Sequence, residues 1–179
     1  MTYQSNQFSQ KYEIIDFEIF LKSDCEYDDI MLGRIDFFQY LWQDEVEVKK
    51  FIASITFYIF NIYKVEDMLL LADSISGDLE YVASAYNVYC NEVGGIGSVA
   101  IIDEPKDFYE KTQMIKYFLA KTIEKLQIIG TGTLLFMSKA LILDLNKSDR
   151  IYLINELLDI NCIPIYQDES DIVLARNLV

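Results

Sequence analysis

The chain has 179 residues, of which 52% are hydrophobic, with only two prolines and seven glycines, so it holds enough apolar material for one folded domain with a sizeable core. It contains no histidine, which excludes the commonest general base, the commonest zinc ligand and every nucleophile that a histidine would activate. Its formal net charge of −14 opposes direct binding to nucleic acid or to an anionic membrane.

The negative charge is unevenly distributed along the chain. Residues 1–110 carry 21 acidic against 7 basic side chains, whereas residues 111–179 carry 8 of each. The excess is densest in two clusters: Asp24, Glu26, Asp28 and Asp29, and Asp44, Glu45 and Glu47. Such a surface attracts a basic partner by long-range steering. A solvated acidic face that favours solubility is the simpler explanation, and both interpretations stay open.

The cysteines and the N-terminal residues bear on the compartment. Cys25, Cys90 and Cys162 are scattered and have no metal-ligand spacing, which is typical of reduced thiols. The first twenty residues lack the pattern of a signal peptide. The longest apolar run, residues 51–60, is about half as long as a helix that spans a bilayer. We therefore expect a cytoplasmic protein without a membrane segment and without a metal site.

Three segments near the N-terminus have the β-branched and aromatic content of strands: residues 11–22, 30–42 and 51–64. In the second of them Ile35 and Phe37 alternate with Arg34 and Asp36, which predicts one buried and one polar face. The third is apolar on both faces, as central strands are. We expect the second and third strands to form an antiparallel pair, joined by a polar connection at QDEVEVKK (43–50).

Helical spacing follows in the sequence. Apolar residues recur at intervals of three and four between residues 73 and 89, with Ser76 as a predicted N-cap. SVAIIDE (98–104) predicts a short buried strand. A second helix is expected to begin at Thr112 and to end at Gly130.

The C-terminal third repeats this alternation. Residues 133–145 read as one strand, and Ser148 and Asp149 are expected to cap a third helix. Two short strands around a polar turn at residues 168–171 follow. Strands that alternate with helices predict an α/β fold, a single mixed sheet with helices packed on its faces. We expect one domain over residues 1–179, with a core over 30–179 and with 1–29 either in the sheet or in a separate arm.

This order and several local segments resemble the GNAT family of N-acetyltransferases. The segments are the long strand pair, the helix ADSISGDLEYVASAY, the strand AIIDE before the expected coenzyme loop, the helix from Thr112, the strand LLFMSKAL and the closing DESDIVLARNLV. The resemblance implies a GNAT-like sheet. In the family, a loop that reads Arg or Gln, two residues, Gly, one residue and then Gly or Ala holds the acetyl-CoA pyrophosphate on backbone N–H groups at a helix N-terminus.

The chain departs from the family at that loop. If Gln113 is the family's first position, Lys116 and Phe118 stand where the small residues should be, and no glycine occurs between Gly97 and Gly130. The family's general acid, a tyrosine, has no counterpart in register, because Tyr152 comes about one turn too early. The resemblance thus implies the fold of the family without its acetyl-CoA site.

Three hypotheses of function follow. The first is a non-catalytic acidic binding domain, an inhibitor, immunity or anti-defence protein that docks on a basic, nucleic-acid-binding surface of another protein. Its partner-binding candidates are Asp24, Glu26, Asp28, Asp29, Trp42, Asp44, Glu45 and Glu47; Trp42 stands with Tyr40 and Phe38 on one strand face. It requires no cofactor.

The second hypothesis is a divergent N-acyltransferase that uses acetyl-CoA. Lys111, Gln113 and Lys116 would then bind phosphate, and Glu104 would act as the base. The third is a homo-oligomeric scaffold joined through the aromatic strand pair.

Overall fold

The computed structural model describes residues 15–23, 29–43, 46–61, 68–93, 97–106, 114–141, 147–169 and 171–178. The elements in chain order are β1 (Ile15–Ser23), β2 (Ile30–Gln43), β3 (Val46–Phe60), α1 (Met68–Ile75), α2 (Gly77–Val93), β4 (Ser98–Lys106), α3 (Ile115–Ile128), β5 (Thr131–Met137), α4 (Ser138–Leu141), α5 (Lys147–Asp159), β6 (Ile163–Gln167) and β7 (Ile172–Asn177).

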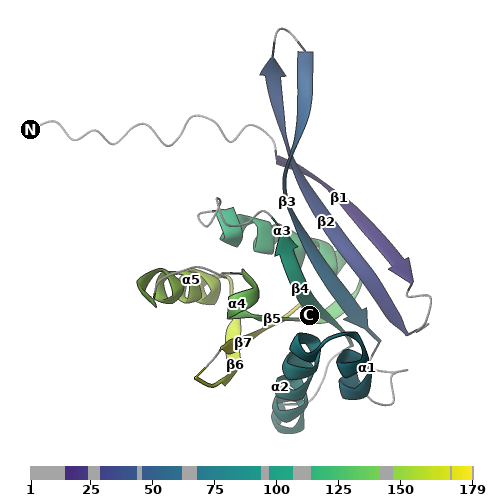
Figure 1. Ribbon diagram of the computed structural model, residues 1–179, viewed down its shortest axis with the longest axis vertical. Coiled ribbons are helices and arrows are strands. Elements are labelled where there is room, and N and C mark those ends of the chain that lie inside the picture. Colours follow the sequence, from purple (N-terminus) through teal and green to yellow (C-terminus); the bar gives the residue numbers. More distant parts are fainter. Residues whose placement is uncertain are drawn as a thin grey trace, which may run out of the picture.

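The strands form one seven-stranded mixed sheet in the order β1-β2-β3-β4-β5-β7-β6 (Figure 1). Neighbouring strands are antiparallel except β4 and β5, which are parallel and are connected by the crossover helix α3. The predicted fold class, one domain with a mixed sheet and helices on its faces, is confirmed. Strand β1 pairs with β2 over its whole length, so part of residues 1–29 joins the sheet as an edge strand.

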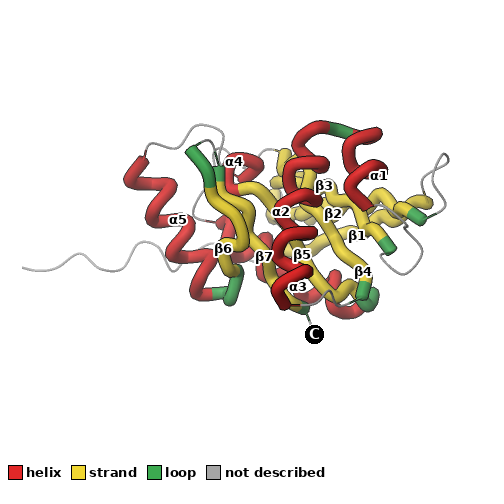
Figure 2. The backbone as a smooth tube through the Cα atoms, turned by 90° about the horizontal axis from the view of Figure 1, so that it is seen from below, coloured by secondary structure: helices red, strands yellow, loops and turns green. Residues whose placement is uncertain are grey.

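The sheet has a hydrophobic cluster on each face. On one face α1 and α2 cover the sheet with buried residues such as Ala72 and Val82, which pack near Phe60 and Ile101 (Figure 2). The opposite face packs against α3, with contributions from α4 and α5. Helices on both faces explain why the central strands β3, β4 and β5 are apolar on both sides.

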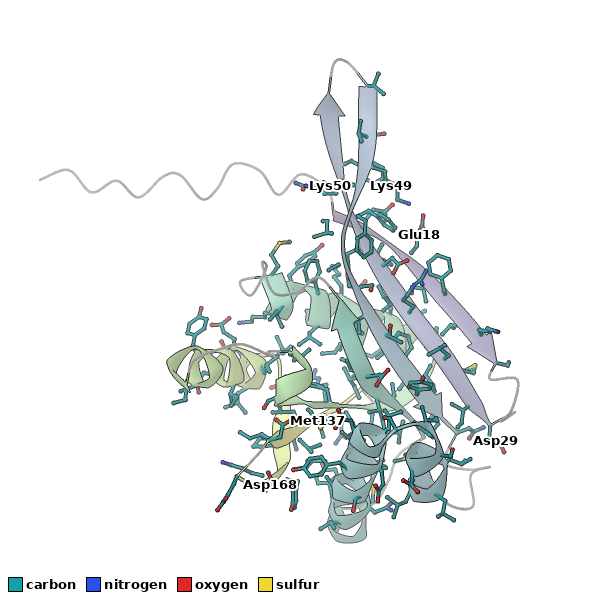
Figure 3. The ribbon with its side chains drawn as sticks, viewed as in Figure 1. Glu18, Asp29, Lys49, Lys50, Met137 and Asp168 are labelled. Atoms are coloured by element: carbon teal, nitrogen blue, oxygen red, sulfur yellow. The ribbon has the colours of Figure 1, made fainter. Side chains whose placement is uncertain are left out.

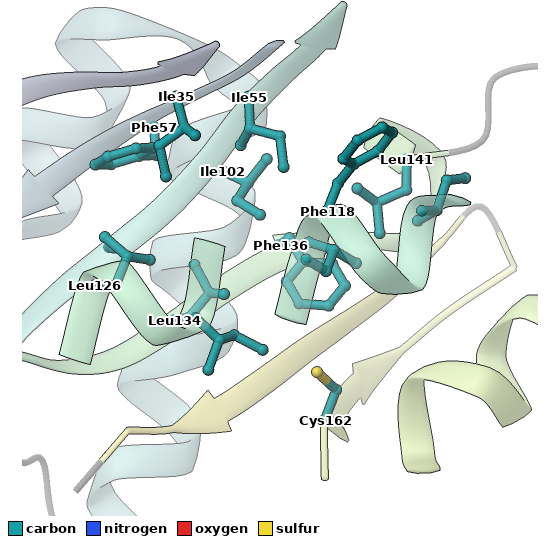
Figure 4. Close-up of a cluster of buried hydrophobic side chains, with 14 of the residues drawn as sticks. Ile35, Ile55, Phe57, Ile102, Phe118, Leu126, Leu134, Phe136, Leu141 and Cys162 are labelled. Carbon is teal, nitrogen blue, oxygen red and sulfur yellow. The ribbon is translucent and has the colours of Figure 1, made fainter. Parts of the chain in front are cut away.

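The larger cluster lies between β2, β3, β4, β5 and α3 (Figure 4). The ring of Phe118 on α3 meets Phe37 on β2 with centroids 4.5 Å apart. Leu126, further along the same helix, is fully buried like Phe118. The predicted apolar face of this helix is therefore its packing face.

Two expectations about the strands are wrong. The segment 43–50 is not a polar connection, because β3 begins at Val46 and pairs with β2 from there. Residues 133–145 are not one strand, because β5 ends at Met137 and α4 follows directly. The expected antiparallel pairing of the two long strands is confirmed.

The helix caps are predicted in part. Ser76 caps α2 as expected, since its hydroxyl accepts a hydrogen bond from the Leu79 N–H at 3.2 Å. The N-cap of α3 is Met114 and not Thr112, which lies outside the described residues. Helix α5 begins at Lys147, so Ser148 and Asp149 lie within its first turn and do not precede it.

Candidate functional site: a hairpin arm and the sheet face at its base

Strands β2 and β3 continue past both of their neighbours. The ladder of β1 on β2 reaches Gln39, and the ladder of β4 on β3 reaches Ser54. Beyond these residues the described strands β2 and β3 pair with each other alone, up to Gln43 opposite Val46. Figure 1 shows this hairpin rising above the rest of the sheet. We call residues 40–43 and 46–51 the arm.

A β-bulge forms the base of the arm. The ladder pairs Phe37 with Ala53 and Phe38 with Phe51, so Ile52 is an additional residue on β3. A bulge increases the local twist and re-aims the strand beyond it. Because of this shift Phe38 and Phe51 share a face, and their rings meet edge to face with centroids 6.0 Å apart.

Side chains of three strands meet on that face. The Tyr40 hydroxyl donates a hydrogen bond to Asp16 of β1 at 3.2 Å, and Lys49 of β3 forms an ion pair with Glu18 of β1. The Lys49 ammonium group also lies 3.9 Å from the centroid of the Phe38 ring, a cation–π contact. Figure 3 shows Glu18 and Lys49 beside each other where the arm leaves the sheet. These contacts tie the arm to the edge strand.

The protonation states at this face follow from the same contacts. The hydrogen bond to Glu18 raises the pKa of Lys49, so its ammonium group is charged at neutral pH. Partial desolvation raises the pKa of Tyr40, with the charge of Lys49 opposing it. The Tyr40 hydroxyl therefore keeps its proton and remains a donor to Asp16.

A second group of polar residues lies further along the same face, toward the body of the sheet. Arg34 pairs with Asp36 at 3.0 Å, and its guanidinium group lies 4.9 Å from the centroid of the Phe20 ring. Asp36 is only 8% exposed, so the ion pair with Arg34 compensates a nearly buried charge. The carboxylates of Glu18 and Asp36 are both engaged with cations, which gives this face an ion-paired character.

The arm itself carries apolar side chains in solvent. Val46 is 61% exposed, Val48 is 38% exposed and Phe51 is 43% exposed. Single exposed apolar residues are common on protein surfaces, but several of them on one projecting element mark a contact site. The arm is therefore the strongest candidate for an interaction element in the described part of the chain.

The described members of the two acidic clusters, Asp29 and Glu47, lie at opposite ends of β2. Asp29 directly precedes the strand, and Glu47 is paired with Trp42 at its far end. At about 3.3 Å per residue, the strand between residues 30 and 42 spans about 40 Å. In Figure 3 Asp29 lies at the end of the sheet that is remote from the arm. Of the described members, Asp29 and Glu47 therefore lie too far apart to share one contact surface.

The other candidates of the binding hypothesis fall outside what the structure describes. These are Asp24, Glu26, Asp28, Asp44, Glu45 and the side chain of Trp42. In the sequence Asp44 and Glu45 connect Gln43 to Val46, the outermost described pair of the arm.

The candidates of the acyltransferase hypothesis lie around β4 and α3. Glu104 belongs to β4, and Lys116 belongs to α3, whereas Lys111 and Gln113 lie outside the described residues. Lys116 pairs with two carboxylates of α5, Glu156 at 3.0 Å and Asp159 at 3.2 Å; these hydrogen bonds raise its pKa, with Glu156 contributing most. Its charge is already compensated within the chain.

The described residues contain no cluster of three or more acidic, cysteine or histidine side chains that could hold a metal ion. Ser138 donates a hydrogen bond to Asp171 at 2.5 Å, and both residues are buried, at 0% and 3% exposure. This contact fixes the end of β5 against the start of β7 and leaves the serine hydroxyl without access to solvent. None of the described helices is long and apolar enough to span a membrane.

Sequence reasoning missed the residues that anchor the arm. Glu18 and Lys49 belong to different predicted segments, and their contact depends on strand register, which spacing along the chain does not reveal. The arm strand could have been found, because VEVKKF (46–51) begins with the strict alternation of a strand. No family model, no curated protein and no solved structure matches the chain.

Proposed function

We propose that this protein is a non-catalytic binding domain whose arm docks on a basic surface of another protein. The observation that carries the proposal is the arm, a two-stranded projection that exposes Val46 and Val48 beyond the last residues paired by β1 and β4, with Phe51 exposed at its base. An element of this kind contributes little to the core, so its apolar side chains are available to a partner.

The charge of the chain supports a basic partner. The net charge is −14, and Asp44, Glu45 and Glu47 occur together in the sequence at the outer end of the arm. Negative charge around an apolar contact speeds association with a positive surface and competes there with phosphate groups. An inhibitor, immunity or anti-defence protein that covers a nucleic-acid-binding groove would need these properties.

The proposal can be tested with a defined probe. Trp42 is the only tryptophan of the chain and belongs to the arm, so its fluorescence reports binding there. We expect a synthetic twelve-residue peptide of alternating arginine and leucine to shift the Trp42 emission, with an affinity that falls as salt increases.

Two variants with the same change in charge separate the arm from the rest of the acidic half. Asp44→Asn with Glu45→Gln should weaken peptide binding at least threefold at low salt, whereas Asp24→Asn with Asp28→Asn should change it less. An equal loss in both variants would show unspecific attraction by the net charge and would contradict docking through the arm.

A second function, a divergent N-acyltransferase, is favoured by one feature. Strand β4 is parallel to β5, and α3 crosses between them, which resembles the strand–helix unit that holds acetyl-CoA in the GNAT family. Titration calorimetry with acetyl-CoA, able to detect an affinity of about 100 μM or about −5.5 kcal/mol, tests it. A one-to-one signal would favour the acyltransferase, and its absence would leave the binding domain as the proposal.

A further inference from the structure

One edge of the arm has no strand beside it in the described part of the chain. On the side away from β2, none of the described residues pairs with residues 46–51 of β3, because the ladder with β4 begins at Ser54. All six of these residues are exposed. A strand edge of this kind presents backbone N–H and C=O groups that a further strand can pair with.

The sequence of this edge is complementary to itself in one antiparallel register. When two copies pair around a twofold axis perpendicular to the sheet, directly opposite residues must point to the same face, so the axis passes midway between the two copies of one residue. With the axis at Val48, Val48 of one copy lies opposite Val48 of the other. Glu47 of each copy then lies opposite Lys49 of the other copy. Two salt bridges then flank an apolar pair.

The neighbouring registers are unfavourable. An axis at Glu47, Lys49 or Lys50 places two like charges directly opposite each other, which destabilises a strand pair. An axis at Phe51 would extend the second strand past Ser54, where β4 already occupies the edge. Only the register centred on Val48 pairs opposite charges within the open edge.

The length of the open edge also fits this register. Residues 46–50 of one copy lie opposite residues 50–46 of the other, and β3 has no residue before Val46. The second strand therefore ends before it reaches Ser54 and β4. Because the strands are antiparallel, the two bodies lie at opposite ends of the joined arms.

We propose that two copies of this chain associate through their arms, edge to edge along β3, with the twofold axis at Val48. Lys49 then lies between Glu18 of its own chain, with which it already forms an ion pair, and Glu47 of the other copy. The pairing continues the arm as a four-stranded ribbon in the order β2-β3-β3-β2. Because the shared surface is small, the dimer is weak and depends on concentration.

Sedimentation velocity on the full chain across a concentration series tests this proposal. The wild type should show a reversible monomer–dimer equilibrium, and Glu47→Lys and Lys49→Glu should each weaken self-association at least tenfold. A 1:1 mixture of these two variants should form a heterodimer, because the two lysines at the edge of one chain then face the two glutamates at the edge of the other. Failure of the mixture to associate while the wild type does would overturn the register.

Two further variants test whether a loss of the dimer reflects misfolding, because the substitution of Lys49 also removes its contact with Glu18. Val48→Asp brings two carboxylates together at the axis and should abolish the dimer, while Val88→Asp on α2, also exposed at 57%, should dimerise like the wild type. A wild type that stays monomeric at about 0.5 mM, a concentration that reveals a dimer with a dissociation constant of about 1 mM or below, would overturn the proposal itself. Asp44→Asn with Glu45→Gln should leave the dimer intact, so failure of partner docking and failure of dimerisation are distinguishable.

Discussion

At the scale of single residues, Gly33 explains how the long strand pair accommodates a phenylalanine. Gly33 on β2 is the direct cross-strand partner of Phe57 on β3. The ring of Phe57 is fully buried and lies across the glycine, so that a Cβ atom at position 33 would stand 2.1 Å from the ring carbon Cε2. The glycine is required by this close approach, and the residues around it in the sequence carry no sign of that role.

We expect Gly33→Ala to destabilise the protein by about 1–3 kcal/mol, because the new methyl group forces the buried Phe57 ring out of its position. Chemical denaturation of the variant measures this loss. Gly77→Ala is the matched control, since a Cβ at Gly77 meets no atom within 4 Å, and its stability should equal or slightly exceed that of the wild type. Equal stabilities of both variants would show that the Phe57 ring moves aside without cost.

The thiols differ in reactivity for a physical reason. Burial raises the pKa of Cys162 to about 12, with the charge of Arg176 opposing the shift. Burial also raises the pKa of the partly exposed Cys90, with a hydrogen bond to Tyr86 opposing it. Because the thiolate is the reactive form, Cys162 is expected to be inert in the folded protein.

Alkylation with iodoacetamide at pH 8, followed by mass spectrometry of the peptides, should therefore modify Cys90 well before Cys162, which reacts only after unfolding. Modification of Cys162 at the same rate as Cys90 would contradict the burial of Cys162.

The raised pKa of Cys162 also has a consequence for stability. The unfolded state releases the Cys162 proton near pH 9.0, the ordinary value, and the folded state only near pH 12. The free energy of unfolding should thus fall as the pH rises through this interval.

At the scale of elements, the sequence predicted the type of most helices and strands and failed where a distant contact decides. The run TLLFMSKAL reads as one strand, but β5 ends at Met137 because Ser138 bonds to Asp171, 33 residues later in the chain. The connection QDEVEVKK reads as polar because its charges outnumber its two valines, whereas pairing with β2 makes it a strand. Cross-strand register is the information that local spacing lacks.

Helices α3 and α5 are joined by a charge contact that can be tested. Lys116 of α3 bonds to Glu156 and Asp159 of α5. Lys116→Met should speed amide hydrogen exchange in α5 without changing it in α2. Lys121→Met is the matched control, because Lys121 pairs with Glu124 of its own helix, and exchange in α5 should stay as in the wild type.

The pH dependence of this contact follows from the direction in which the pKa of Lys116 is shifted. The hydrogen bonds to Glu156 and Asp159 raise the pKa of Lys116 above the ordinary 10.5. The contribution of the pair is therefore fully present below pH 10.5 and is lost as the pH rises through the raised value. Protection of α5 that is insensitive to both the substitution and added salt would show that apolar contacts alone hold the helix.

At the scale of the whole molecule, the described fold consists of the arm and of a body, which is the rest of the sheet with the helices on its faces. Every hydrophobic cluster of the described residues lies in the body, while residues 46–51 are all exposed. Composition and periodicity predicted the body but not the arm. Asp29 and Glu47, the described members of the two acidic clusters, are separated by the length of β2, so the sequence identified candidate residues without their arrangement.

The arm should be removable without unfolding the body. Tyr40 and Lys49 are direct partners, so replacing residues 41–48 by Asn-Gly closes a two-residue hairpin between them. We expect thermal unfolding within a few degrees of the wild type, because the deleted Val46 and Val48 are exposed and belong to neither hydrophobic cluster, together with loss of self-association. A large drop in the unfolding temperature would show that the arm supports the body.

The place of β7 has a consequence for how the chain is synthesised. Strands β1 to β5 are neighbours in the order in which they leave the ribosome, so each can be added to the edge of the growing sheet. Strand β7 instead enters between β5 and β6 and buries Val173, Leu174 and Ala175. Until residues 172–177 have emerged from the ribosome, the edge of β5 that pairs with β7 stays unpaired and apolar. We therefore expect chaperones to bind a nascent chain that stalls before these residues are synthesised.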